Sequence, residues 1–466
     1  MKLPNYEEAK SRTKVDIVYK DVNIKYEEVF KNKKYFLRTY GCQMNVHDSE
    51  EISNYLIMLG MSKTEVLKDA DVILLNTCAI RENAHDKVIG FLGRCKHVKK
   101  LNKDLIIIIM GCMAAQEDVV KEFQDKHKYI DIIIGPNNIY DLPKLLLERQ
   151  KGQNIEVHSN SDIVPENVKY HRDSKISAWV NVMYGCDKFC TYCIVPYTRG
   201  RERSRKKEAI LKECKCLIEN GYQEITLLGQ NVNAYGNDLY SDYNFASLLE
   251  DIAKLGIPRL RFVTSHPWNF TDKMIDVIAK YDNIMPYIHL PIQSGSNNIL
   301  RKMNRRYTKE EYLNLVDKIR KKIPKAAITT DIIVGFPGET KEDFKETIDV
   351  VNCCKFDGAY TFIFSKRKGT PAALLKDDTP LEEKEKRLAT LNELVNRYSK
   401  ENNKRLLGKM VPVLIMGVSE KDNTKMYGYT DTFKLVNVAF DKAFIGKIIA
   451  VKIIDAKSFS LDGKLT

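Results

Sequence analysis

The sequence predicts a multidomain α/β protein with three folded units. These are an N-terminal doubly wound parallel α/β domain, a central partial (βα)6 barrel and a small C-terminal all-β barrel. Two successive series of short apolar runs alternate with amphipathic helices, a pattern typical of parallel sheets covered by helices. A polar stretch separates the two series. After the second series, short alternating strands separated by turns indicate a β barrel.

The predicted boundaries follow these changes of pattern. The first residues mix charges with Tyr and Val and show no strong period, so we expect a partly ordered extension there. A chain of 466 residues is long enough for several hydrophobic cores. The predicted units are the extension at 1–34, the N-terminal α/β domain at 35–155, a linker at 156–172, the partial barrel at 173–402 and the β barrel at 403–466.

In the N-terminal domain, four apolar runs predict buried strands at 35–41, 71–78, 105–112 and 130–135. Amphipathic patterns between them predict helices, among them 48–60 and 114–126. Strands that alternate with helices in this way form a parallel sheet with helices on both faces.

The central unit repeats this alternation. Strands are predicted at 178–185, 224–231, 259–267, 286–295, 327–338 and 359–364, and a long charged helix at 381–406 closes the series. Six β/α units are fewer than the eight of a closed barrel, so the sequence predicts a partial barrel. The C-terminal strands are predicted at 411–418, 425–430, 434–440, 447–454 and 458–466.

Composition narrows the class of protein. The formal net charge of +13 indicates a polyanionic partner such as nucleic acid, although lysine-rich solvated faces would give the same charge. The most apolar run, 105–115, is too short to span a membrane, and the first residues do not resemble a signal peptide. We therefore expect a cytoplasmic protein, and in such a chain eleven cysteines favour metal binding or catalysis over disulfides.

Three cysteines are clustered at the end of the first predicted barrel strand. Cys186, Cys190 and Cys193 have the spacing Cys-x3-Cys-x2-Cys. Thiolates bind zinc, copper(I) and iron–sulfur centres. A [4Fe–4S] cluster normally takes four cysteines, so three leave one iron open. The alternative is a zinc site completed by a distant ligand, but structural zinc sites favour paired Cys-x2-Cys.

This CxxxCxxC motif resembles that of the radical S-adenosylmethionine superfamily. The resemblance implies a partial (βα)6 barrel that binds S-adenosylmethionine at the carboxyl ends of its strands, with the open iron as one ligand. Three strand ends contain glycine, which lets a backbone approach a ligand closely. The candidate cofactor-binding residues there are Gly229, Gln230, Gln293, Ser294 and Gly335. The alternative is that these loops are only tight turns.

Three more cysteines follow predicted strands of the N-terminal domain. Cys42, Cys78 and Cys112 each come directly after an apolar run. Because the carboxyl ends of parallel strands share one edge of the sheet, we expect them to meet and to form a second three-cysteine cluster site. The alternative is that they are ordinary buried cysteines. The remaining cysteines fall inside predicted helices and build no obvious site: Cys95, Cys214, Cys216, Cys353 and Cys354.

Two such triplets in this domain order resemble the methylthiotransferase family, from about residue 35 to the end. In that family the last domain is called TRAM and binds RNA. The segments TYGCQMN, LLGQNVNAYG and HLPIQSGS resemble the branch that makes 2-methylthio-N6-isopentenyladenosine in tRNA. This implies radical C–H activation at C2 of the isopentenylated adenosine at tRNA position 37.

The resemblance also implies cofactors and partners. These are two [4Fe–4S] clusters, S-adenosylmethionine, the anticodon stem-loop of tRNA, a sulfur source and an electron donor such as flavodoxin or ferredoxin. We expect no catalytic residue beyond the cluster ligands, because a radical, unlike a base, can break an unactivated aromatic C–H bond. We also expect a monomer.

Two alternatives stay open. A close relative could act on threonylcarbamoyl-adenosine in tRNA. A protein of another class, a zinc-stabilised RNA-binding protein without chemistry, would also contain cysteines and basic segments.

Two groups of arginines are candidate RNA contacts, because arginine binds phosphate well. Arg199, Arg201, Arg203 and Arg205 follow the central triplet, and Arg305 and Arg306 form the second group. The alternative is that these arginines pair with carboxylates inside the barrel.

Overall fold

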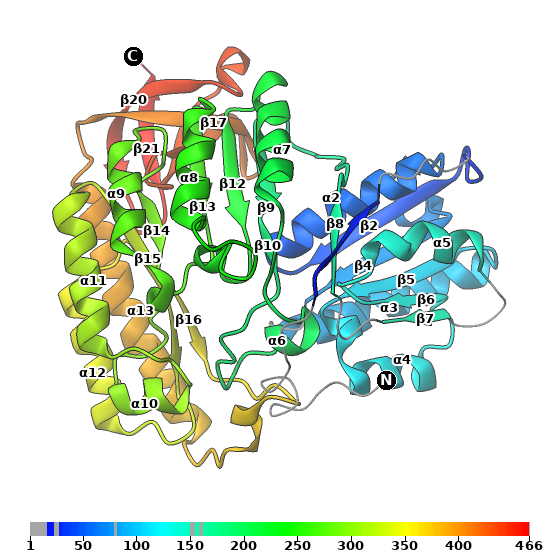
Figure 1. The fold of residues 1–466 in the computed structure, drawn as a ribbon, viewed down its shortest axis with the longest axis horizontal. Helices are drawn as coiled ribbons and strands as arrows, with labels where there is room; N and C mark the ends of the chain where they lie inside the picture. The colour runs from blue at the N-terminus through cyan, green and yellow to red at the C-terminus, as the bar shows by residue number, and fades with distance from the viewer. Residues whose placement is uncertain (1–15, 23–27, 79–81, 150–153, 158–161, 466) are drawn as a thin grey trace.

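The structure, a computed structural model, describes residues 16–22, 28–78, 82–149, 154–157 and 162–465. Figure 1 shows three units: an N-terminal α/β unit on one side, a central unit of strands and helices, and a small β barrel packed on one end of the central unit. Among the described residues, no helix has both the length and the apolar character needed to cross a membrane.

The N-terminal unit is a parallel six-stranded sheet with the order β3-β2-β4-β5-β6-β7. Its strands are β2 (Lys34–Tyr40), β3 (Ser62–Lys63), β4 (Val72–Thr77), β5 (Ile106–Gly111), β6 (Ile132–Ile134) and β7 (Asn154–Glu156). Every residue of β4 and β5 is buried, as expected of central strands covered on both faces.

Helices cover both faces of this sheet, which confirms the predicted doubly wound class. One core lies under α2 (Gln43–Met58) and α5 (Leu142–Leu147). A second core lies under α3 (Glu82–Leu101) and α4 (Glu117–Lys126). The side chains of each central strand alternate between the two cores.

Helix α2 begins earlier than the sequence predicts. It starts at Gln43 rather than near residue 48, and its first turns bury polar side chains such as Asn45, Asp48 and Glu51. Asn45 bonds to Asn76 of β4, Glu51 accepts from Tyr55 and Asp48 accepts from Arg199 of the central unit. Because these buried positions are polar, the start of the helix shows no hydrophobic period in the sequence.

The central unit contains the six predicted strands as two parallel three-stranded sheets, β13-β12-β9 and β14-β15-β16. A bridge between Leu260 and Ile284 joins them. The strands are β9 (Ser177–Asn181), β12 (Glu224–Leu228), β13 (Arg259–Phe262), β14 (Tyr287–His289), β15 (Ala327–Val334) and β16 (Gly358–Ile363).

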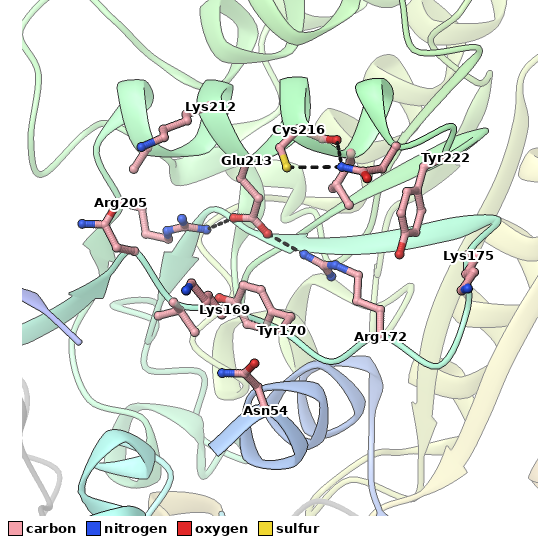
Figure 2. Close-up of a pocket in the computed structure, with 15 residues that line it drawn as sticks. Asn54, Lys169, Tyr170, Arg172, Lys175, Arg205, Lys212, Glu213, Cys216 and Tyr222 are labelled. Atoms are coloured by element: carbon pink, nitrogen blue, oxygen red, sulfur yellow. Dashed lines mark hydrogen bonds and ion pairs between the residues drawn. The ribbon is translucent and has the colours of Figure 1, made fainter. Parts of the chain in front are cut away.

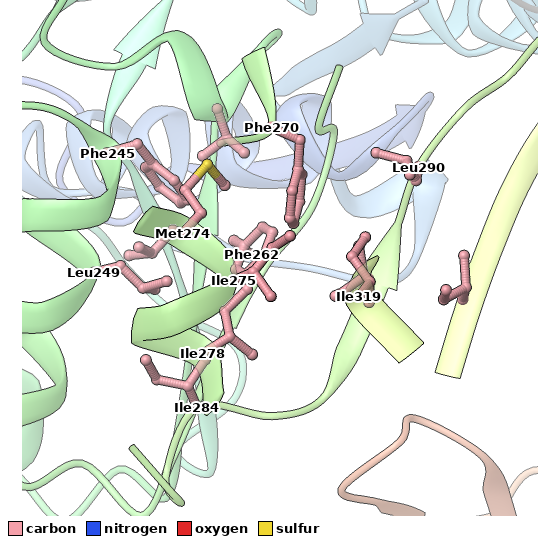
Figure 3. Close-up of a cluster of buried hydrophobic side chains, with 14 of the residues drawn as sticks. Phe245, Leu249, Phe262, Phe270, Met274, Ile275, Ile278, Ile284, Leu290 and Ile319 are labelled. Atoms are coloured by element: carbon pink, nitrogen blue, oxygen red, sulfur yellow. The ribbon is translucent and has the colours of Figure 1, made fainter. Parts of the chain in front are cut away.

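The helices of the central unit pack on the outside of these strands (Figure 1). They are α7 (Lys207–Glu219), α8 (Phe245–Lys254), α9 (Asp272–Lys280), α10 (Asn297–Lys302), α11 (Lys309–Lys322), α12 (Lys341–Cys354) and α13 (Leu381–Lys404). Figure 3 shows part of the core, where Phe245 of α8 and Met274 of α9 lie against Phe262 of β13. Burying each such side chain stabilises the fold by roughly 1.5–3 kcal/mol.

The C-terminal unit is a closed five-stranded barrel, as predicted. Its strands are β17 (Met410–Ser419), β18 (Asp422–Thr430), β19 (Leu435–Ala439), β20 (Ile448–Ala456) and β21 (Leu461–Leu465). Two buried arginines of β13 hold it on the central unit. Arg259 donates to the backbone oxygens of Tyr429 at 2.7 Å and Pro412 at 3.0 Å, and Arg261 donates to that of Thr430 at 2.9 Å.

The predicted extension and linker also contain strands. β1 (Val18–Asp21) pairs in parallel with β8 (Ile163–Glu166). The hydroxyl of Tyr19 donates to the backbone oxygen of Ser204, which ties this ribbon to the central unit. Each segment is only four residues long, with the sequences VYKD and IVPE, so neither shows the longer apolar run that predicts a buried strand.

We predict that Arg259→Ala loosens the C-terminal barrel. The change removes three hydrogen bonds from a charged donor, the shorter two each worth about 1.5–3 kcal/mol, and leaves the carbonyl oxygens of Tyr429 and Pro412 without this donor. Scanning calorimetry and limited proteolysis should show earlier unfolding and faster cleavage of the C-terminal unit. Lys386→Ala is the control, since Lys386 is exposed and, among the residues that the structure describes, its ammonium pairs only with Glu382 on its own helix. An unchanged cleavage rate for Arg259→Ala would contradict the docking role.

Candidate functional site

The loop that carries the central cysteine triplet is closed by two short antiparallel strands. β10 (Met183–Tyr184) pairs with β11 (Arg203–Ser204). The Cys186 N–H donates to the Gly200 oxygen at 3.1 Å, and the Cys193 N–H donates to the Cys190 oxygen at 2.9 Å. These bonds hold the three thiols in one compact loop, which is what a common metal centre needs.

Glycine at position 185 is a steric requirement of this loop. Gly185 has a φ of 70°, and an added Cβ would lie 2.0 Å from the carbonyl oxygen of Arg201. Gly111, which precedes Cys112, has a φ of 95°, and its Cβ would lie 2.3 Å from the Thr77 oxygen. The backbone therefore passes its neighbours too closely for any side chain just before a cysteine of each triplet.

The N-terminal triplet meets at the carboxyl edge of the sheet, where the sequence places it. The register aligns Tyr40 with Thr77, and Thr77 with Gly111, so the cysteines that follow these strands lie at one level. A hydrogen bond from the Cys78 thiol lowers the pKa of Cys42 to about 6, against the effect of burial. Burial raises the pKa of Cys112.

The two triplets face each other across the boundary between the N-terminal and central units. Cys112 packs in one small apolar cluster with Phe189, Ile194 and Tyr197 of the central loop. A charge on Cys112 is also one of the causes that raise the pKa of Cys193, although burial is the largest. The six cysteines therefore belong to one composite site.

Arg199 crosses this boundary. It is 4% exposed, and its Nε donates to the Sγ of Cys112 at 3.2 Å while its Nη2 donates to Asp48 of α2 at 2.6 Å. The central loop thus places a guanidinium directly on a cysteine of the N-terminal triplet.

Arg305 makes the corresponding contact with the central triplet. Its Nη1 lies 3.5 Å from the Sγ of Cys190, and its other donors reach the Pro291 oxygen and the Tyr307 hydroxyl. Within the described part of the chain no carboxylate pairs with this buried guanidinium. A buried cation without a counter-ion is costly, so the site fits an anionic group at Cys190.

The donor set therefore fits thiolate-bound clusters. Three cysteines in each triplet, each set beside a buried arginine, match the ligands that iron–sulfur clusters use. In the described residues no three His, Cys, Asp or Glu side chains are arranged to hold one metal ion. A four-iron cluster binds its cysteines through different irons, so its ligands stand further apart than the ligands of one ion.

The candidate cofactor residues lie at strand ends, and their cofactor contacts stay a prediction. Gly229 is close-packed, because an added Cβ would lie 2.7 Å from Met183, and a Cβ at Gly335 would lie 2.5 Å from Lys384. Gln293 has a φ of 74°, a strained conformation that is common at ligand sites. Ser294 is buried with its hydroxyl 3.5 Å from that of Thr347, and Gln230 is half-buried.

The arginines predicted to contact RNA lie in different environments. Arg199, Arg203, Arg205 and Arg305 are buried. Arg205 pairs with Glu213 at 2.8 Å, and Arg203 donates to the Arg199 oxygen. Arg201 is half-buried and pairs with Asp187, whereas Arg306 is exposed. Arg201 and Arg205 thus pair with carboxylates of the central unit, as the alternative expected, whereas Arg199 pairs with Asp48 of the N-terminal unit. RNA contact stays a prediction for the set.

A cavity of about 790 Å³ lies between α7, α2 and the segment 167–175, and none of the six cysteines lines it (Figure 2). Glu213 stands at its centre and accepts hydrogen bonds from Arg172 and Arg205. Arg172 also reaches Glu50 of α2 at 3.1 Å. This network joins the two units, and sequence reasoning missed it because its carboxylates carry no motif.

Family models identify the class of protein. Residues 180–351 match the radical SAM superfamily, residues 404–466 match the TRAM domain, and residues 34–135 match a model described as uncharacterized protein family UPF0004. The radical S-adenosylmethionine methyltransferase TsrM from Kitasatospora setae has a similar fold, with a TM-score of 0.56 and 14% identity over 74% of this chain and 75% of that chain. The chain is a radical S-adenosylmethionine enzyme with a C-terminal TRAM domain.

Similar sequences give the family within this class. The tRNA-2-methylthio-N(6)-dimethylallyladenosine synthase of Staphylococcus epidermidis is 51% identical and covers 99% of this chain and 91% of that protein. The synthase of Bacillus subtilis is 50% identical, with coverages of 99% and 92%. This chain belongs to the family of tRNA-2-methylthio-N(6)-dimethylallyladenosine synthases.

We predict that anaerobic reconstitution gives about eight irons per chain, four for each triplet. Changing Cys42, Cys78 and Cys112 together to Ala should leave about four, as should changing Cys186, Cys190 and Cys193. Iron analysis with electron paramagnetic resonance of the reduced proteins measures this. Eight irons retained after loss of the N-terminal triplet would rule out a second cluster there, and a colourless protein loaded with zinc would rule out both.

We predict that Gly185→Ala reduces the iron bound at the central triplet. The new Cβ would overlap the Arg201 carbonyl, so the loop must move and its thiols with it. Gly221→Ala is a matched control, because Gly221 also has a positive φ, of 82°, but nothing lies within 4 Å of an added Cβ. Equal iron contents in the two variants would show that the loop tolerates the clash.

Proposed function

We propose that the protein adds a methylthio group to C2 of N6-isopentenyladenosine at position 37 of tRNA. The observation that carries this proposal is the composite site, in which two cysteine triplets face each other across one small apolar cluster. A reaction that both generates a radical and delivers sulfur needs two such centres close together. Membership of the synthase family supports the same substrate.

We propose that Cys186, Cys190 and Cys193 hold one [4Fe–4S] cluster and that Cys42, Cys78 and Cys112 hold a second. When bound, these clusters and S-adenosylmethionine supply the radical and sulfur chemistry that the protein side chains lack. Three cysteines in each triplet leave one iron for an outside ligand, so a fourth cysteine would block the site.

The chain's own residues shape the space between the two centres. Phe189, Ile194 and Tyr197 are buried there and exclude water, which protects a reactive radical from side reactions. Arg199 and Arg305 each place a positive charge beside a cysteine sulfur, where the negative charge of a thiolate-bound cluster would lie. No acid–base constellation is needed, because hydrogen-atom removal requires no acidic C–H bond.

The proposed reaction also needs other molecules. An electron donor such as flavodoxin or ferredoxin and a source of sulfur must act with the enzyme. The TRAM domain supports a tRNA partner, and a tRNA-modifying enzyme of this kind would act in the cytoplasm. We infer that the anticodon loop unstacks its adenosine to reach the composite site, because a base cannot react while it is stacked in the loop.

We predict that tRNA from a strain lacking this gene contains isopentenyladenosine in place of its 2-methylthio derivative. Mass spectrometry of the nucleosides measures both. The wild-type gene should restore the methylthio product, whereas genes in which all three cysteines of either triplet are changed to Ala should not. If the deletion strain keeps its methylthio-isopentenyladenosine and loses the methylthio group of threonylcarbamoyl-adenosine, the alternative substrate is correct.

A further inference from the structure

Trp268 is an exposed aromatic side chain in a rigid loop of the central unit. It lies in the 3-10 helix η5 (Pro267–Asn269), which follows β13, and 44% of its surface is exposed. The loop is well fixed, because the Asn233 side chain and the His266 backbone exchange hydrogen bonds of 2.8 and 2.9 Å. A large ring held in solvent by a rigid loop fits a binding role.

Two cations lie against this ring. The Nζ of Lys188 is 4.8 Å from the ring centroid, and the Cζ of Arg306 is 5.1 Å from it. Neither forms an ion pair with a carboxylate among the residues that the structure describes, although Glu202 lies near enough for the charge of Lys188 to lower its pKa against the larger effect of burial. Both cations therefore keep charge available for an anionic ligand.

This surface borders the composite site. Lys188 lies in the loop between Cys186 and Cys190, and Arg306 follows Arg305, whose guanidinium contacts Cys190. Arg306 also lines a cavity of about 290 Å³ together with Arg301, which is exposed and likewise has no ion pair among the described residues. The four residues Lys188, Trp268, Arg301 and Arg306 form what we call the Trp268 platform.

We propose that the Trp268 platform binds single-stranded RNA of the anticodon loop: a base next to the reacting adenosine stacks on Trp268, and the flanking phosphates contact Lys188, Arg301 and Arg306. Stacking on an aromatic side chain beside a cationic groove is how proteins hold unpaired nucleotides. The surface fits RNA better than a protein partner, because three of the four residues of the platform are cations that lie around one aromatic ring and the cavity beside it, although Glu311 also lines that cavity. This inference rests on the proposed function in one respect, that the substrate is an RNA loop.

The test is binding of a labelled anticodon stem-loop containing isopentenyladenosine to the reconstituted full-length protein, followed by fluorescence anisotropy. Trp268→Ala should raise Kd about tenfold, within the range for loss of one stacked base. Trp268→Phe should restore most of the affinity, whereas Trp268→Leu should not. Lys188→Ala and Arg306→Ala should each lower the slope of log K against log salt by about one unit.

Two controls accompany these variants. Leu101→Ala removes an exposed apolar side chain at the end of α3, in the N-terminal unit, and should leave Kd unchanged. A fully double-stranded RNA of the same length should compete poorly, because its bases are not free to stack. Iron analysis of each variant separates loss of RNA binding from loss of a cluster. If Trp268→Ala loses iron, the Kd values of Trp268→Phe and Trp268→Leu are compared instead to test the stacking contact.

The outcomes are distinguishable. Equal Kd values for the unaltered protein and Trp268→Leu, or equal weakness of Trp268→Phe and Trp268→Ala, would overturn the platform while leaving the proposed function intact. If the unaltered protein does not bind the stem-loop at all, the proposed function fails first. Equal competition by double-stranded RNA would mean that charge alone accounts for binding, and would also overturn the stacking contact.

Discussion

The composite site depends on one contact, the insertion of Arg199 from the central loop into the N-terminal unit. Its guanidinium is shared between Asp48 and the Cys112 sulfur, and all three groups are buried. Removing the arginine would leave a carboxylate buried without a counter-ion, which costs several kcal/mol, roughly 3–5 in comparable buried pairs. The same contact fixes the distance between the two cysteine triplets, because Arg199 lies six residues after Cys193. Arg199 therefore links the packing of the two units directly to the geometry of the site, whereas the Arg172 network joins the units away from the cysteines.

The sequence predicts the cysteine positions well because they follow from topology. Residues that come directly after parallel strands must meet at one edge, so Cys42, Cys78 and Cys112 could be grouped without coordinates. The six central strands and the C-terminal barrel follow from hydrophobic period in the same way. The pairing of β1 with β8 and the early start of α2 could not be predicted, since both depend on contacts with distant segments rather than on local pattern.

The roles of charged side chains were harder to predict for a physical reason. An arginine binds phosphate, carboxylate or thiolate with the same donors. The arginine-rich segment after Cys193 would therefore have the same sequence whether its side chains face solvent or the interior. Burial decides between these roles, and burial is a tertiary property. Arg199 and Arg305 lie on cysteine sulfurs, while Arg306, next in sequence to Arg305, lies at the surface against Trp268. Trp268 itself carries no motif that would distinguish it from a core tryptophan.

The docking of the C-terminal barrel has a consequence for how this family can vary. Arg259 and Arg261 hold it through carbonyl oxygens of the main chain, which every residue type supplies. Substitutions on the barrel that preserve its strands leave these acceptors in place. The side chains on the outer face of the barrel can therefore change without loss of its attachment to the central unit.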